Sequence, residues 1–231
     1  MIDSLGGSDV GGQPDNADKS TLVEQIYQQV LDAIVGGELA EGAELNQVTL
    51  AKKFGVSRIP VREALQRLHA ERLLNAQPFH RYTVRTLSAP ELNELVEIRL
   101  LLECFALRKF GGELDHAELE QLRELNDSLR SETDPQRWLE GDWELHRRLA
   151  GGDSASAEFA GDIRRRINRY LNTAGRLGNR HTLAVEDHEI ILSALMEGDL
   201  TAAEARLRDH IEATGRALSE LVARQADPTL E

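Results

Sequence analysis

Apolar residues in the first third of the chain recur at the spacing of three short helices. The first face precedes Gly36 and consists of Leu22, Ile26, Val30 and Ile34. The other two lie on either side of Gly55 and consist of Val48, Leu50, Ala51 and Phe54, then of Val61, Ala64, Leu65 and Leu68. Thr21, followed by Glu24 three residues later, has the pattern of a capping box and predicts the start of the first helix. Two short helices joined by a glycine-containing turn predict a helix-turn-helix.

Beyond the third helix the apolar period shortens to that of strands. Residues 74–77 and 81–86 alternate large and polar side chains on either side of Pro78, as a β-hairpin does. Residues 20–86 are therefore predicted to form a winged helix-turn-helix domain. Residues 1–19 are rich in glycine and poor in large apolar groups, so we expect a disordered tail before it.

Helical spacing returns after the hairpin and continues to the end of the chain. We expect helices at about 90–110, 115–131, 135–150, 157–177, 183–197 and 200–224, separated by glycines or by Asp134-Pro135. Residues 87–90 are interpreted as a linker, in which Ser88 caps the next helix and Pro90 lies in its first turn. The predicted fold is mainly α. An all-helical antiparallel bundle over residues 91–226 follows the first domain, and its interior can hold a ligand.

Charge is divided unevenly between the two predicted domains. The net charge is −13, yet residues 58–85 contain six arginines and two glutamates, a net charge of +4. Residues 87–231 contain 18 basic and 29 acidic residues. A locally basic patch can neutralise phosphates, so we expect the first domain to bind DNA. No apolar run approaches the ~20 residues of a membrane-spanning helix, and a single cysteine, Cys104, fits a reducing cytoplasm.

The predicted second helix of the helix-turn-helix has a polar face suited to DNA. This face carries Arg58, Arg62, Gln66 and His69, with both arginines in the half that follows the turn. Arginine near the start of a helix in the major groove can bond guanine O6 and N7. Arginines on a helix face are also common as solvated surface, and the spacing alone leaves both interpretations open.

The exact sequence around the turn adds a family resemblance. The string Phe54-Gly-Val-Ser-Arg-Ile-Pro-Val-Arg-Glu-Ala-Leu65 closely resembles the signature of the GntR superfamily of bacterial transcription regulators, and the resemblance continues through Val84. It implies a homodimer that binds a palindromic operator in double-stranded DNA. It implies DNA contacts from Arg58 and Arg62, supported by Ser57 and Pro60. We add Thr49 and Arg81 as candidate DNA-binding residues.

The chain departs from this family's pattern at two positions where glycine is usual. Arg72 replaces the first, and Arg81 replaces the glycine at the tip of the wing. A left-handed conformation costs a non-glycine residue about 1 kcal/mol. Either the wing turns differently here, or Arg81 strengthens contact with a narrow minor groove. Thr49 stands where some members of the family have a basic residue.

Further polar residues lie on apolar stripes of the predicted bundle. Asp142 and His146 are four apart on one helix and in line with leucines, while His188 and His210 lie in line with apolar residues on two later helices. A single inward histidine is more often a hydrogen-bonded core residue. Four uncompensated polar groups would be costly, however, and one cation would satisfy them all. The ligand types suit a divalent metal ion: zinc is expected first, with nickel, manganese and iron as alternatives.

The segment from Leu92 to Glu103 resembles the opening of the FCD effector domain found in the FadR-type branch of the superfamily. The metal-binding form of that domain implies the same four ligands, Asp142, His146, His188 and His210. Arg99 takes the place of a recurrent arginine and either holds a carboxylate effector in a bidentate pair or forms a salt bridge with Glu103 one turn later. The implied effector is a small organic acid.

We therefore expect a sequence-specific transcriptional regulator, in the first instance a repressor, controlled by an organic acid bound at a metal site. The alternative is a metal-dependent enzyme domain fused to a DNA-binding module. The sequence contains no HExxH motif, and we find no candidate general base beside the metal ligands. These features favour a regulator over an enzyme.

Overall fold

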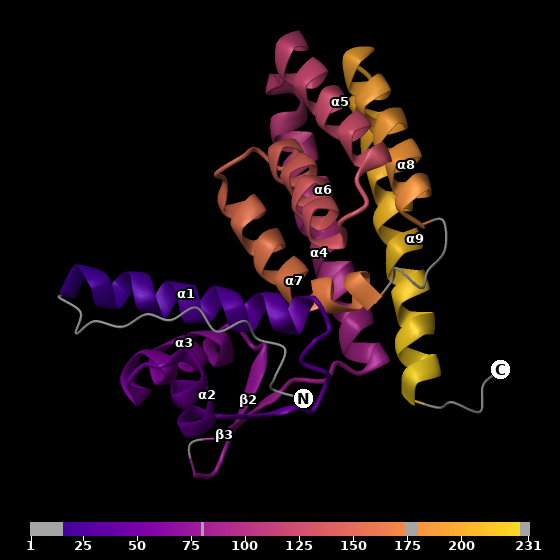
Figure 1. Cartoon of the computed structure of the whole chain (residues 1–231). Coiled ribbons are helices and arrows are strands. Elements are labelled where there is room, and N and C mark those ends of the chain that lie inside the picture. Colours follow the sequence, from indigo (N-terminus) through magenta and orange to yellow (C-terminus); the bar gives the residue numbers. More distant parts are fainter. Residues whose placement is uncertain (1–15, 80, 174–179, 227–231) are drawn as a thin grey trace. The chain divides into compact units, whose positions relative to one another are not determined.

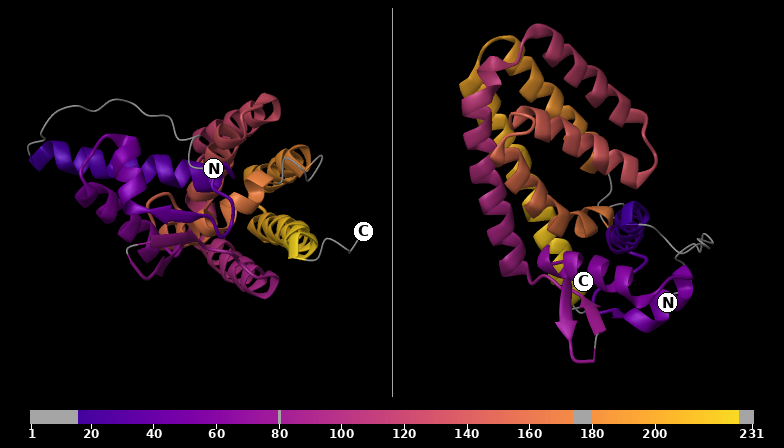
Figure 2. Two further views of the ribbon diagram at one scale, coloured as in Figure 1. Left: turned by 60° about the horizontal axis from the view of Figure 1, so that its bottom comes forward. Right: turned by 90° about the vertical axis from the view of Figure 1, so that its left-hand side faces the viewer.

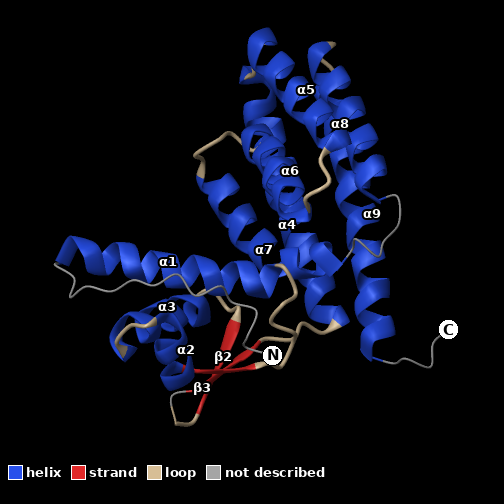
Figure 3. Ribbon diagram, viewed as in Figure 1, coloured by secondary structure: helices blue, strands red, loops and turns tan. Residues whose placement is uncertain are grey.

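The computed structural model describes residues 16–79, 81–173 and 180–226. The chain forms two compact units that divide between Thr86 and Leu87, and each is described by itself. Figure 1 shows the chain coloured along its length, and Figure 3 shows that strands occur in the first unit while helices make up the second.

The part of the first unit that the structure describes combines three helices with a small antiparallel sheet. Its elements are α1 (Asn16–Val35), β1 (Glu44–Asn46), α2 (Gln47–Phe54), α3 (Arg58–Ala70), β2 (Leu74–Gln77) and β3 (Arg81–Val84). The strand order is β1-β3-β2, with both neighbouring pairs antiparallel. The winged helix-turn-helix is therefore confirmed. Strand β1 was not predicted, because three residues are too few to show a period.

Helix α1 starts earlier than its sequence pattern predicts. It begins at Asn16, so Thr21 lies inside the helix and the predicted capping box at its start is wrong. Residues 16–19 of the predicted disordered tail are helical, whereas residues 1–15 of that tail lie outside the described residues. At the other end, the helix stops before Gly37, whose φ of 77° is in the left-handed region that favours glycine.

The helix-turn-helix is stabilised by local capping and by one shared hydrophobic core. Asn46 caps α2, its side-chain oxygen accepting hydrogen bonds from the backbone N–H groups of Val48 (2.8 Å) and Thr49 (3.2 Å). Gly55 then adopts φ 66°, which lets the chain turn sharply into α3. The fully buried side chains of the core include Val30, Ile34, Leu45, Leu50, Val61, Leu65, Leu68 and Leu74. Val48, predicted to face this core, is 44% exposed because the buried face of α2 starts at Gln47.

The predicted hairpin is present, but its left-handed residue is not the predicted one. Arg81 lies in β3 opposite Gln77, and the positive φ of 62° falls on Phe79 instead. Arg81 therefore does not take the left-handed conformation that a glycine at the tip would provide. Arg72, the other residue at a usual glycine position, does take the left-handed conformation, with φ 60°.

In its described residues, 87–173 and 180–226, the second unit is a bundle of six α-helices with one short 3-10 turn. Its elements are α4 (Ala89–Phe110), η1 (Gly111–Glu113), α5 (His116–Ser131), α6 (Pro135–Leu149), α7 (Ala155–Thr173), α8 (Arg180–Met196) and α9 (Leu200–Ala226). Figure 2 shows the helices from two further directions. Ser88 caps α4 by accepting a hydrogen bond from the Glu91 N–H (3.3 Å), with Pro90 in the first turn, as predicted. Residues 174–177 of the predicted fourth helix of the bundle lie outside the described residues.

The interior of this bundle mixes apolar layers with buried polar side chains. Apolar residues of α4, α5, α6, α8 and α9 form its largest hydrophobic cluster, which includes Leu107, Leu122, Leu145, Leu192 and Leu207. The buried polar or charged side chains are Arg99, Glu103, Asn126, Asp142, His146, Arg164, His188 and His210. No described helix of either unit is both long and apolar enough to cross a membrane.

Candidate metal centre and DNA-binding helix

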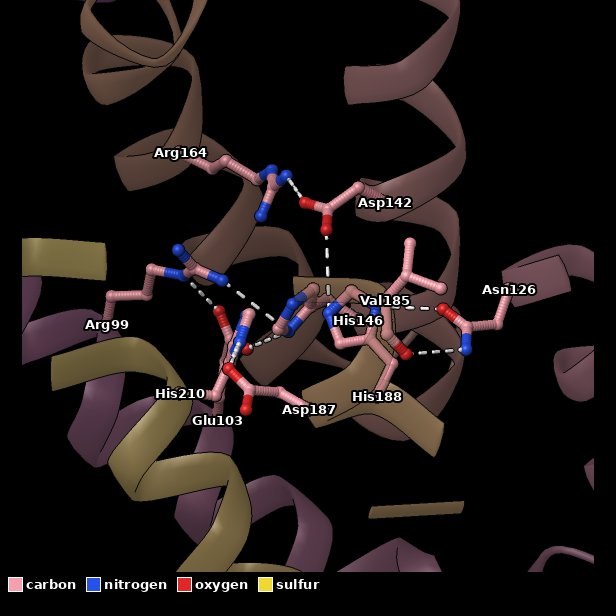
Figure 4. Close-up of polar contacts among 10 residues, drawn as sticks. All are labelled: Arg99, Glu103, Asn126, Asp142, His146, Arg164, Val185, Asp187, His188 and His210. Carbon is pink, nitrogen blue, oxygen red and sulfur yellow. Dashed lines mark hydrogen bonds and ion pairs between the residues drawn. The ribbon is translucent and has the colours of Figure 1, made fainter. Parts of the chain in front are cut away.

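Three helices of the bundle each bring one histidine to the same point in its interior. His146 comes from α6, His188 from α8 and His210 from α9, and none is more than 4% exposed. One ligating nitrogen from each ring lies within 4.8 Å of the other two. Figure 4 shows the three rings facing one another. The apolar stripe on each helix puts its histidine inside, and the packing of the three helices brings them together.

The other ring nitrogen of each histidine is held by a hydrogen-bond acceptor. Nδ1 of His146 lies 2.7 Å from Oε2 of Glu103. Nδ1 of His188 lies 3.1 Å from the side-chain oxygen of Asn126, and Nδ1 of His210 lies 3.1 Å from Oδ2 of Asp187. An acceptor at Nδ1 keeps the proton there and leaves the lone pair of Nε2 available to a metal ion.

The Nε2 atoms of His146 and His188 are buried and have no hydrogen-bond partner among the described residues. Burial lowers the pKa of His188 well below its usual value, and the neighbouring His210 lowers it further. Burial also lowers the pKa of His146, although Glu103 opposes this shift. Neutral imidazole with a free Nε2 is the form that binds divalent metals.

Asp142 lies one turn before His146 on α6 and borders the three histidines. Its Oδ1 is 3.5 Å from Nε2 of His188, while its Oδ2 accepts a hydrogen bond from the guanidinium of Arg164. Burial raises the pKa of Asp142, but Arg164 and the histidines outweigh it and hold that pKa well below its usual range. Asp142 is not part of the group of ligand atoms within 4.8 Å of one another, which consists of the three histidines.

Arg99 of α4 borders the same interior and is 3% exposed. Its Nε donates to Oε1 of Glu103 at 2.5 Å, and a terminal nitrogen lies 3.4 Å from Nδ1 of His146. The predicted salt bridge between Arg99 and Glu103 is present, and Arg99 also lies beside His146. Burial raises the pKa of Glu103, but Arg99 and His146 bring it well below its usual range, so Glu103 is ionised.

Sequence reasoning missed four residues of this centre. Asn126, Arg164 and Asp187 received no role, and Glu103 was considered only as a partner of Arg99. Asn126 could have been found, because it lies in line with Leu119, Leu122 and Leu129 on the inner face of α5. Its Nδ2 donates to the carbonyl oxygen of Val185 at 3.0 Å, which turns its own oxygen toward His188. Arg164 opens a run of three arginines that looks like solvated surface in the sequence.

The start of α3 in the first unit presents exposed polar residues. Ser57, Arg58 and Arg62 are exposed, and neither arginine forms a salt bridge among the described residues. Arg67 of the same helix is used differently: it pairs with Glu24 at 2.5 Å and lies 3.8 Å over the ring of Tyr27. Arg67 therefore stabilises the fold, whereas the two arginines of the first half remain available to a ligand.

The remaining predicted DNA contacts differ in how accessible they are. Thr49 of α2 is exposed, and so is Arg81, which lies 3.4 Å from Glu44 on β1. Pro60 is buried in the first turn of α3. A buried proline offers no surface to DNA, so its role as a direct contact is not supported. Its fixed φ suits the first turn of a helix, and Pro60 therefore positions the neighbouring arginines.

Known protein families match both units of the chain. Residues 22–84 match bacterial regulatory proteins of the gntR family, and residues 94–213 match the FCD domain. The second match alone spans more than half of the chain. The gntR family consists of bacterial regulatory proteins, which confirms the expectation of a regulator rather than an enzyme.

Individual relatives agree with these matches. The chain is 27% identical over 196 residues to the uncharacterized HTH-type transcriptional regulator YdhC of Bacillus subtilis, covering 80% of this chain and 86% of the relative. It is 27% identical over 216 residues to a probable D-xylose utilization operon transcriptional repressor of Paenarthrobacter nicotinovorans, covering 84% and 88%. The solved structure of Escherichia coli McbR/YncC superposes with a TM-score of 0.73 at 22% identity, over 89% of this chain and 99% of that one, which shows a shared fold.

Proposed function

The chain belongs to the GntR family of bacterial regulatory proteins and carries an FCD domain, and from this premise we propose that it is a metal-dependent, acid-responsive repressor. In this proposal α3 reads operator DNA, the three histidines of the bundle hold a divalent metal ion, and an organic carboxylate bound there changes operator affinity. The protein acts in the cytoplasm, where its DNA target lies. The observation that carries the proposal is the meeting of three buried histidines whose Nδ1 atoms are each held by a separate acceptor.

DNA recognition is assigned to the exposed first half of α3. Arg58 and Arg62 supply guanidinium groups that are free to bond base edges or phosphates, with Ser57 beside them. Thr49 and Arg81 supply the flanking contacts. A single small domain seldom gives enough affinity for an operator. We therefore infer a homodimer on a palindromic site, with recognition helices ~34–36 Å apart.

The metal assignment rests on the chemistry of the donors. The Nε2 atoms of His146 and His188 are buried and have no hydrogen-bond partner among the described residues, and His210 joins them within the same short range. Unpaired buried polar atoms are costly, and a cation compensates them. Asp142 is the fourth proposed ligand, held in place by Arg164. Zinc fits this donor set best, and nickel, manganese and iron are the alternatives. Bound there, the metal supplies a Lewis-acidic position for an oxygen ligand.

The charge of the centre favours an anionic effector. Its buried charged side chains form two pairs, Arg99 with Glu103 and Arg164 with Asp142, and so balance one another. A divalent cation adds two positive charges to this balanced interior. Charge buried without compensation is unfavourable, so a bound carboxylate is stabilised. Arg99, with a terminal nitrogen beside His146, is the side chain proposed to contact it.

Effector control requires a difference in effector affinity between two states of the protein. Such coupling is typically about 1–3 kcal/mol, so operator affinity should change roughly 5- to 150-fold. The similarity to a probable transcriptional repressor supports assigning repression rather than activation.

Elemental analysis of protein purified without an affinity tag tests the proposal. We expect one metal ion per chain in the wild type, none in His188→Ala/His210→Ala, and a full complement in the control His116→Ala, whose side chain is 82% exposed. The double variant should remain folded by circular dichroism and bind the operator without responding to carboxylates. If the wild type contains no stoichiometric metal and takes none up on titration, the metal centre and the sensing proposal are both wrong.

A further inference from the structure

The interior of the bundle contains buried hydrogen-bond donors that a metal ion does not explain. Among the buried polar atoms with no hydrogen-bond partner in the described residues are Nε2 of His146, Nε2 of His188, Nε1 of Trp138 and Nε of Arg164. The two histidine nitrogens are acceptors that suit the proposed metal ion. The nitrogens of Trp138 and Arg164 carry hydrogen and can only donate, so a cation leaves both of them unpaired.

Trp138 lies on the inward face of α6, one turn before Asp142 and two turns before His146. It is 5% exposed, and its ring stacks on His181 of α8 with the ring centroids 4.1 Å apart and the planes 10° from parallel. Further along the same two helices, the rings of His146 and His188 are 5.2 Å apart. The helices α6 and α8 therefore run side by side in the same direction. The stack of Trp138 on His181 forms the layer next to the histidines, ~12 Å away along α6 at 1.5 Å per residue.

Arg164 of α7 meets the same part of the interior through Asp142. It is 2% exposed, and a terminal nitrogen of its guanidinium donates to Oδ2 of Asp142. Oδ1 of Asp142 lies 3.5 Å from Nε2 of His188, and Figure 4 shows the two oxygens turned to these different partners. Both unpaired donors thus belong to residues that adjoin Asp142, Arg164 by direct contact and Trp138 by one helical turn.

Buried N–H groups of this kind normally have an acceptor. An indole or guanidinium N–H that loses its hydrogen bonds to water without replacing them destabilises the folded protein. Oxygen atoms of a bound molecule supply the missing acceptors. Such a molecule reaches from the histidines past Asp142 to Trp138, and it carries oxygen at both of its ends.

The charge of the interior specifies what those oxygens are. The pairs of Arg99 with Glu103 and Arg164 with Asp142 balance, so a divalent cation leaves two positive charges to be compensated. One carboxylate compensates only one of them, whereas two carboxylates compensate both. Asp142 is itself anionic, but it pairs with Arg164 and faces the proposed metal ion, so its charge is already compensated.

We propose that the effector is a dicarboxylate with one carboxylate at the proposed metal ion and the other bound by Nε1–H of Trp138 and Nε–H of Arg164. This distal subsite names the effector class and therefore rests on the proposed function. Arg99 contacts the proximal carboxylate, beside His146. The stack on His181 fixes the plane of the indole, and with it the position of the N–H that the distal carboxylate meets.

Isothermal titration calorimetry on the full chain carrying one equivalent of zinc is the first experiment. It compares straight-chain acids of equal length that differ in the second carboxylate: succinate with butyrate, glutarate with pentanoate, and adipate with hexanoate. In at least one pair the wild type should bind the dicarboxylate ~10-fold or more tightly than its monocarboxylate counterpart, because hydrogen bonds to a charged group contribute about that much.

Trp138→Phe tests the indole N–H alone, since phenylalanine keeps an aromatic ring against His181. The affinity for the preferred dicarboxylate should fall ~10-fold, while the affinity for the monocarboxylate and the zinc content stay unchanged. Unchanged monocarboxylate binding also shows that the variant is folded. Trp143→Phe is the matched control, because it makes the same change at a half-buried residue whose N–H is not among the unpaired buried atoms. It should keep the preference.

The control variant also gives a second readout. The chain has two tryptophans, so Trp138 is the sole tryptophan in Trp143→Phe. Its fluorescence emission should change when the preferred dicarboxylate is added and stay constant when the monocarboxylate of the same length is added. A carboxylate that binds at the metal alone does not reach the indole.

The outcomes separate the distal subsite from the proposed function. A wild type that binds both acids of every pair equally well, or a Trp138→Phe variant that keeps the full preference, overturns the subsite and leaves the acid-responsive metal site standing. A wild type that takes up no zinc, or that binds none of these acids, overturns both. A dicarboxylate preference that is lost in Trp138→Phe and kept in Trp143→Phe supports the subsite.

Discussion

Glu103→Gln is the substitution that most directly tests how the histidine centre is held. One oxygen of Glu103 accepts from Arg99 at 2.5 Å and the other lies 2.7 Å from Nδ1 of His146. Glutamine keeps the size of the side chain but removes its charge, and it offers only one acceptor oxygen. The variant therefore leaves buried Arg99 without a counter-charge and loosens the orientation of His146.

The two consequences have different expected magnitudes. Removing one partner of a buried ion pair typically costs about 3–5 kcal/mol of unfolding free energy. Removing a residue that orients a metal ligand typically costs ~10- to 100-fold in metal affinity. Native domains are stable by about 5–15 kcal/mol, so we expect a folded but weakened variant. Urea unfolding in the presence of a chelator measures the first effect, and zinc competition with a chromogenic chelator measures the second.

Arg99→Met/Glu103→Leu separates the two effects. Removing both charges avoids an unpaired ion, so the unfolding free energy should recover by most of the loss seen in Glu103→Gln. Metal affinity should stay low, because His146 still lacks its acceptor. Glu97→Gln, on the exposed face of the same helix, is the matched control and should change neither quantity. Wild-type zinc affinity in Glu103→Gln, or its return in the double variant, would refute this account of His146.

Three further predictions concern single residues. Arg62→Ala should weaken operator binding by about 1–3 kcal/mol at fixed salt. The control Arg130→Ala, at an exposed position in α5, should leave operator binding unchanged. Equal effects of the two substitutions in a gel-shift titration would contradict the assignment of α3 as the DNA-binding helix. Arg72→Gly should raise the unfolding free energy by up to ~1 kcal/mol, because Arg72 has φ 60°; a loss of stability in urea would show that the arginine side chain matters more than its backbone. The unfolding free energy of the metal-free protein should fall as the pH drops below ~6.5, by about 1.4 kcal/mol per pH unit for each proton taken up on unfolding. The reason is that histidine in the unfolded chain takes up a proton in this range, while buried His188 stays neutral to lower pH. An unfolding free energy that is constant between pH 7 and 5.5 would contradict this.

The sequence alone determined the order and type of nearly all elements. Helical and strand periods are local properties, so the helix-turn-helix, the hairpin and the six helices of the bundle could be located from apolar spacing. The same periodicity placed His146, His188 and His210 on inward faces. Apolar periodicity did not predict β1, which is too short to show a period. It also placed the start of α1 too late, because residues before Thr21 continue the helix.

Tertiary structure decided which side chains surround the histidines. His146 meets Glu103 across 43 residues of sequence, Asp142 meets Arg164 across 22, and His188 meets Asn126 across 62. Periodicity says that a side chain points inward, but it does not say which helix lies opposite or at what height along the bundle. Those facts follow from the packing of whole helices against one another, to which residues throughout the bundle contribute. The ionised state of Glu103 has the same origin, because it depends on Arg99 and His146 lying beside it in the interior.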